Sequence, residues 1–205
     1  MSDKIRKIER TLKYTGHRVK VYEDTMITPE GEKLYYDYVE NRNGAGILLV
    51  DEDGKLVLVR QYRQVLDGES IEIPAGCMEP DDVAGSSAGD QAAGAPEDIL
   101  TKGEAPENME AFQKCARREA EGETGLVPGK LHFINYIVAS VGLFSERTAV
   151  FIGTDCKPGD INRDSDEYMD VIRITPDEAL KYVETGKIHD SKTIIAIYAY
   201  LLKFC

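Results

Sequence analysis

Two glutamates near the middle of the chain have the residue type and the spacing to hold a metal ion. Glu119 and Glu123 are four positions apart, inside the stretch 108–126, where apolar residues recur at helical spacing. On a helix, the two carboxylates would stand one turn apart on the same side and could bind one hard cation such as Mg²⁺. Glu121 would point away from them. The alternative is an ordinary solvated helix face.

The helix that must carry these glutamates has further local signals. Gly125 follows its last turn, where a residue with positive φ is commonly needed. Its inward face would consist of Met109, Phe112, Ala116 and Ala120. A second helix is predicted to open with a capping box at Thr175 and to stop at Gly186. A third helix starts at Ser191, with a predicted buried stripe of Ile194, Ile197, Tyr198 and Leu201.

Strands are predicted on both sides of the glutamate helix. Residues 5–40 alternate apolar and polar side chains around a turn at 28–31, which favours an antiparallel arm. Residues 51–54 form a hairpin signal between two apolar runs, and residues 139–147 form a loop between two more. The four strands expected from these runs are 46–50, 55–63, 132–138 and 148–153.

The sequence around the glutamates forms a recognisable pattern. Its two parts are Ile71-Glu-Ile-Pro-Ala-Gly76 and Arg118-Glu-Ala-x-x-Glu-x-Gly-Leu126. The pattern resembles the signature of the Nudix hydrolases and, more narrowly, of their ADP-ribose pyrophosphatase branch; the similarity continues in 59–63 and 145–147. This resemblance implies an α/β fold, a Nudix-type α/β/α sandwich with a mixed sheet. A small antiparallel N-terminal β arm (1–42) would precede the hydrolase domain (43–205).

The resemblance also implies an activity and a set of site residues. The expected reaction is metal-dependent hydrolysis of a nucleoside diphosphate linked to a second group, with ADP-ribose giving AMP and ribose 5-phosphate as the leading case. Mg²⁺, or Mn²⁺, would be held by Glu119, Glu123 and the carbonyl of Ala75. Glu146, in a loop that Gly142 and Ser145 would leave lightly anchored, would take a proton from the attacking water. The predicted substrate-binding residues are Arg63, Glu72, Tyr36, Arg18 and Asp37.

Several of these assignments have alternatives. Arg63 could be a surface arginine at a strand end, and the tyrosines of the arm could simply cover one face of a sheet. Arg118 is expected to brace the strand end and Glu72, whose fixed partner would be Arg118 or a metal-bound water. In the family resembled, the arm is exchanged between two subunits, so a homodimer is expected.

The chain departs from the family pattern at two places. Gly122 stands where the family has a metal-binding glutamate, which supports a rival interpretation: a catalytically impaired nucleotide-binding module. Stability does not explain this glycine, because glycine inside a helix costs about 1 kcal/mol relative to alanine. An insertion at about 83–107 separates the two parts of the pattern and could be a lid or a solvated excursion. Because of the insertion, two residues could be the first acidic residue of the family pattern: Asp82, counting forward from Gly76, and Glu110, counting back from Arg118.

Composition excludes several classes of partner. The net charge of −12 argues against nucleic acid or an anionic membrane surface, since either would require a basic face. The N-terminal residues lack the apolar core of a secretory signal, and the longest apolar run, 194–202, is too short to span a bilayer. The 4 cysteines have no CxxC spacing, which favours reduced thiols. A cytoplasmic protein acting on a small-molecule nucleotide sugar is therefore expected.

Overall fold

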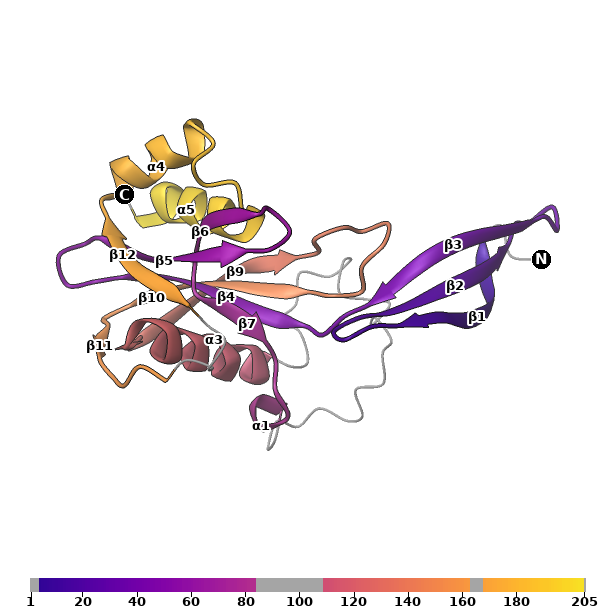
Figure 1. Cartoon of the computed structure of the whole chain (residues 1–205), viewed down its shortest axis with the longest axis horizontal. Coiled ribbons are helices and arrows are strands. Elements are labelled where there is room, and N and C mark those ends of the chain that lie inside the picture. Colours follow the sequence, from indigo (N-terminus) through magenta and orange to yellow (C-terminus); the bar gives the residue numbers. More distant parts are fainter. Residues whose placement is uncertain (1–3, 84–108, 163–167, 205) are drawn as a thin grey trace.

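The body of the protein is built on a mixed seven-stranded sheet (Figure 1). The computed structural model describes residues 4–83, 109–162 and 168–204. The strand order is β12-β5-β4-β10-β9, with β6 paired to β5 and β7 paired to β4; the β4–β10 pair is parallel. The strands are β4 (Gly44–Val50), β5 (Leu56–Arg63), β6 (Gly68–Glu72), β7 (Ala75–Cys77), β9 (Lys130–Ile137), β10 (Thr148–Thr154) and β12 (Met169–Ile174).

Helices cover both faces of this sheet. On one face lies α3 (Met109–Thr124), and on the other lie α4 (Pro176–Glu184) and α5 (Ser191–Phe204) (Figure 1). The alternation of side chains along β4 divides the core, because Ile47 and Leu49 pack with α3 whereas Leu48 packs with α5. A short helix, α1 (Pro80–Val83), and a small ladder of β8 (Leu126–Val127) with β11 (Lys157–Pro158) complete the body. The predicted α/β/α sandwich is confirmed.

The N-terminal arm is a separate three-stranded antiparallel sheet that projects from the body (Figure 1). It consists of β1 (Arg6–Thr15), β2 (Lys20–Ile27) and β3 (Lys33–Glu40). Arg10 donates two hydrogen bonds of 2.6 Å to the carboxylate of Asp24 and lies over the ring of Tyr38, 3.5 Å from its centroid. These hydrogen bonds lower the pKa of Asp24. The arm was predicted from alternation, and its presence is confirmed.

The local signals predicted from the sequence mark the observed element ends. Gly125 and Gly186 have φ of 70° and 73° and follow α3 and α4, and the capping box at Thr175 is complete. The stripe predicted for α5 was wrong at Tyr198, which is exposed, because the buried positions on this helix are Thr193, Ala196, Ile197 and Tyr200. The lid and excursion alternatives for the insertion fall on residues 84–108, outside the described residues.

Candidate active site

The two glutamates predicted to bind a metal lie on the side of α3 that faces the sheet. Both are largely buried, with Glu119 8% and Glu123 3% exposed. Glu119 packs directly on the backbone of β7: a Cβ atom added to Gly76 would collide with the Glu119 carboxylate. Ala75, the predicted carbonyl ligand, is the neighbouring residue in β7. The structure thus brings Glu119 together with the strand that precedes the insertion, although the two are more than forty positions apart in the chain.

This donor set is suited to a hard divalent cation. Carboxylate and carbonyl oxygens are the ligands that Mg²⁺ and Mn²⁺ prefer, and two buried carboxylates on one helix face need positive charge nearby. Within the three described ranges, no three His, Cys, Asp or Glu side chains gather closely enough to hold a metal ion. Glu119 and Glu123, the two predicted side-chain ligands, both lie on α3, and the Ala75 carbonyl stays the predicted third ligand.

Arg118 ties the two parts of the sequence pattern together. Its guanidinium donates to Glu119 Oε1 at 2.6 Å, to Asp82 Oδ2 at 2.8 Å and to the carbonyl of Cys77 at 3.0 Å. Arg118 therefore braces the end of β7, as predicted. Asp82 is buried and accepts this contact, whereas Glu110 is exposed and pairs with Lys114 at 3.2 Å. Of the two candidates for the leading acid, Asp82 is the one at the site.

Glu72 has partners that differ from the expected one. The prediction of Arg118 as its partner was wrong: Arg63 donates two hydrogen bonds to Glu72, at 2.7 and 2.8 Å, and Lys192 donates a third at 2.8 Å. Burial alone would raise the pKa of Glu72, but the hydrogen bonds from Arg63 and the charge of Lys192 outweigh it and lower the pKa to about 2. The carboxylate is therefore held ionised between two cations.

Sequence reasoning missed Lys192, which lies 120 positions after Glu72 in the first turn of α5. No spacing rule links the two residues; the only available signal was that a buried acid requires a cationic partner. Arg63, for its part, lies within electrostatic range of the metal site, because the charge of Glu123 contributes to raising its pKa, after the larger effect of Glu72.

The loop that carries Glu146 is anchored on both sides of this residue. The backbone N–H of Ser145 donates to the carbonyl of Val39 at 3.0 Å, and that of Arg147 donates to Asn43 Oδ1 at 2.9 Å. The side-chain amide of Asn41 donates to Glu146 Oε2. The expectation of a lightly anchored loop was wrong, because its anchors are backbone and amide groups of the segment that leads from the arm into β4.

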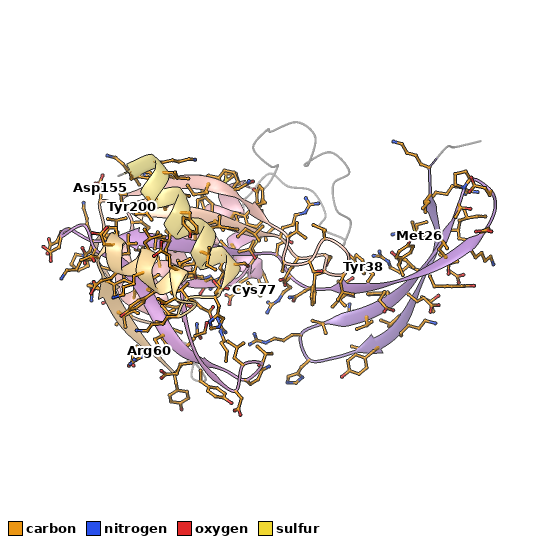
Figure 2. The ribbon with its side chains drawn as sticks, turned by 90° about the horizontal axis from the view of Figure 1, so that it is seen from above. Met26, Tyr38, Arg60, Cys77, Asp155 and Tyr200 are labelled. Carbon is orange, nitrogen blue, oxygen red and sulfur yellow. The ribbon has the colours of Figure 1, made fainter. Side chains whose placement is uncertain are left out.

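The arm places the three predicted substrate-contacting residues at different distances from the body. Tyr36 and Asp37 lie midway along β3, paired with Asp24 and Glu23 of β2. Arg18 lies in the turn between β1 and β2, near the body, because the neighbouring Lys20 pairs with the last residue of β3. Figure 2 shows Tyr38 on the arm outside the body, and Tyr36 is further toward the tip. One subunit alone therefore does not bring Tyr36 to the α3 glutamates.

Gly122 has a packing role that the sequence did not reveal. The N–H of Asn162 donates to the Gly122 carbonyl at 3.1 Å, and the N–H of Gly159 donates to the Gly125 carbonyl at 2.8 Å. The segment 159–162 thereby satisfies carbonyls that the end of α3 leaves without helical partners. A Cβ atom at Gly122 would lie 3.1 Å from the carbonyl oxygen of Asn162. This close approach leaves little room for a side chain at position 122.

The end of β7 lies on the half of the body that is nearer the arm (Figure 2). In Figure 2, Cys77, at the end of β7, lies on the half of the body nearer the arm, and Asp155 lies at the opposite end. Cys77 itself, which directly follows Gly76, is partly buried and forms no disulfide bond.

Within the described ranges, no helix is long and apolar enough to cross a membrane.

Comparison with known proteins adds relatives that match three quarters or more of the chain. The chain is 30% identical over 192 residues to the ADP-ribose pyrophosphatase of Bacillus subtilis (strain 168), covering 93% of this chain and 89% of that protein. It is 29% identical over 195 residues to the methanol dehydrogenase activator of Bacillus methanolicus, covering 92% and 90% of the two chains. It is 30% identical over 165 residues to the GDP-mannose pyrophosphatase of Enterobacter sp. (strain 638), covering 76% and 71%.

Structural comparison agrees with this picture at the level of the fold. The crystal structure of an ADP compounds hydrolase matches with a TM-score of 0.73 at 16% identity, covering 95% of this chain and 91% of that one. At this identity the likeness concerns the fold alone. No protein-family model matches the chain.

Proposed function

Because this chain belongs to the Nudix hydrolases, and within them to the ADP-ribose pyrophosphatase branch, we propose that it hydrolyses ADP-ribose to AMP and ribose 5-phosphate. The observation that carries the proposal is the packing of Glu119, on α3, against Gly76 of β7, with Glu123 on the same helix face. GDP-mannose is the second candidate substrate, from the name of a relative that matches a shorter part of the chain.

In the proposed reaction, each residue of the site has a separate role. Mg²⁺ or Mn²⁺, held by Glu119, Glu123 and the Ala75 carbonyl, would supply positive charge to the pyrophosphate and make a bound water more acidic. Arg118 fixes one oxygen of Glu119 and so orients that carboxylate. Glu146 takes the proton from the attacking water. Arg63 uses Nε and Nη2 to bind Glu72, and its side chain is 39% exposed, so the N–H groups of Nη1 are the ones that would contact a phosphate.

The proposed enzyme is a homodimer in which the arms are exchanged. Six apolar side chains of the arm are exposed, more than solubility favours on so small a sheet: Ile5, Ile8, Leu12, Tyr14, Tyr35 and Tyr36. A second subunit would cover part of this surface. Exchange would also bring Tyr36, Asp37 and Arg18 to the partner's pocket, where the ring and the guanidinium could stack on the adenine. A cytoplasmic location remains a prediction.

The test is incubation with ADP-ribose and Mg²⁺, followed by chromatography. AMP and ribose 5-phosphate should form in equal amounts, and chelation of the metal should stop their formation. Parallel incubations with GDP-mannose, UDP-glucose and a dinucleoside polyphosphate would identify which group the enzyme prefers to find linked to the nucleoside diphosphate. Tight binding of ADP-ribose without AMP above the no-enzyme level would instead support the nucleotide-binding module that Gly122 suggests.

A further inference from the structure

The segment that joins the arm to the body is bonded to the loop of the proposed general base. We name residues 39–44 the arm root and residues 139–147 the acid loop. The N–H of Val39 donates to the Leu143 carbonyl at 2.8 Å, and the N–H of Gly44 donates to the Arg147 carbonyl at 3.0 Å. Val39 and Phe144 also form a parallel bridge. These bonds continue the parallel pairing of β4 and β10 beyond the end of the sheet. The acid loop therefore runs alongside the arm root.

Asn41 is the residue of the arm root that reaches the catalytic side chain. Its backbone N–H donates to Ser145 Oγ at 3.1 Å, and its side-chain Nδ2 donates to Glu146 Oε2. The contact holds one carboxylate oxygen and leaves Oε1 to accept a proton. An amide suits this task because it donates a hydrogen bond without the positive charge of Lys or Arg, which would make the carboxylate a weaker base.

We propose that Asn41, in the arm root, is a positioning residue for Glu146. The inference rests on the proposed function, in which Glu146 takes the proton from water. The backbone of the acid loop is already fixed by Val39 and Asn43. Asn41 adds the orientation of the side chain, whose several rotatable bonds would otherwise leave the carboxylate in many directions.

The decisive experiment is a double-mutant cycle on the full-length protein with ADP-ribose. Asn41→Ala should lower kcat about tenfold with KM changed less than about twofold, because the lost interaction orients the base and does not contact substrate. In the Glu146→Gln background, the same substitution should have no further effect on kcat. Asn135→Ala is the matched control and should leave kcat unchanged, because Asn135 is an exposed asparagine on β9 whose side-chain oxygen accepts from the Tyr136 N–H at 2.8 Å.

Two results would overturn the inference. One is an Asn41→Ala enzyme with undiminished kcat; the other is a Glu146→Gln enzyme that Asn41→Ala slows by the same factor as the wild type. The side-chain amide resonance of Asn41 provides a readout that is independent of turnover, and it should shift on Glu146→Gln but not on Asn135→Ala. If the Asn41 side-chain amide resonance were unchanged by Glu146→Gln, the contact between Asn41 and Glu146 would be excluded. If the wild type did not hydrolyse ADP-ribose while the resonance shifted, the proposed function would fail, and the catalytic part of the inference with it.

Discussion

The body and the arm of this protein reach stability in opposite ways. In the body, β4 is covered by helices on both faces, and Ile47, Leu48 and Leu49 are fully buried. In the arm, the buried residues of the described strands are polar, Asp24 and Thr25, while apolar side chains such as Tyr35, 63% exposed, face outward. A sheet of three strands needs a covered apolar face for independent stability. Within one chain, the body thus buries its apolar strands, whereas the arm leaves its apolar side chains exposed.

The largest effect is expected from removing the arm while leaving its root. Deletion of residues 1–37 should abolish both the dimer and the turnover of ADP-ribose, because the exposed apolar surface and Tyr36 are lost, while the arm root that holds the acid loop stays. Light scattering on a sizing column and product chromatography measure the two properties. A truncated monomer with undiminished kcat/KM would show that the arm, unlike the body, has no part in catalysis.

A large effect should also come from the helix face in the body. Glu119→Gln keeps the shape of the side chain but removes a charge that would bind the metal, so kcat/KM should fall by about 10² or more at fixed Mg²⁺. The matched control is Glu121→Gln on the same helix, whose side chain instead accepts from the Asp160 N–H at 3.3 Å and should change kcat/KM little. Equal losses in the two variants would contradict the assignment of the metal-binding face.

The buried ion network of the body should appear in the pH dependence of stability. Because the pKa of Glu72 is lowered from 4.5 to about 2 in the folded protein, this group contributes stability above pH 4.5 that is lost as the pH falls toward 2. The full contribution is about 3 kcal/mol at 1.36 kcal/mol per pKa unit. Denaturant unfolding of wild type and Glu72→Gln, compared at pH 7 and near pH 3, should show a difference that shrinks with acidity. A constant difference would mean that Glu72 does not titrate in this range.

The smallest effect is expected at Gly122, where the body departs from its family. Gly122→Glu should lower the Mg²⁺ concentration for half-maximal activity a few-fold and raise kcat, since it adds a carboxylate on the helix beside Glu119 and Glu123. Gly122→Ala is the matched control, because it crowds the carbonyl of Asn162 equally but adds no ligand. If both variants had the wild-type metal dependence, position 122 would not be a metal site in this chain.

The features that the sequence predicted correctly are local ones. The helix end at Gly125 and the capping box at Thr175 depend on neighbours within a few residues, so their signals are complete in a short window. The two glutamates of α3 belong to the same class, because their spacing alone places them on one face.

The features that the sequence did not reveal depend on contacts between distant positions. Lys192 reaches Glu72 across 120 positions, and Asn41 reaches Glu146 across 105. The approach of Asn162 to Gly122 is made through backbone groups, which every residue type carries, so no residue type signals it. Local patterns thus identify the helix that carries Glu119 and Glu123, whereas the contacts that distant residues make with Glu72, Glu146 and Gly122 are seen only in the folded chain.

The contact between Lys192 and Glu72 also has a consequence for how the protein is made. Synthesis proceeds from the N-terminus, so the strand bearing Glu72 leaves the ribosome long before α5, whose Thr193 accepts a hydrogen bond from the Ile73 N–H at 2.8 Å. The parallel pairing of β4 with β10 likewise joins segments about a hundred positions apart. Such non-local contacts slow folding, because a long loop must close before they form. The nascent chain therefore carries α3 while Glu72 still lacks one of its two cations, and the buried ion network of the body is complete only after α5 has docked.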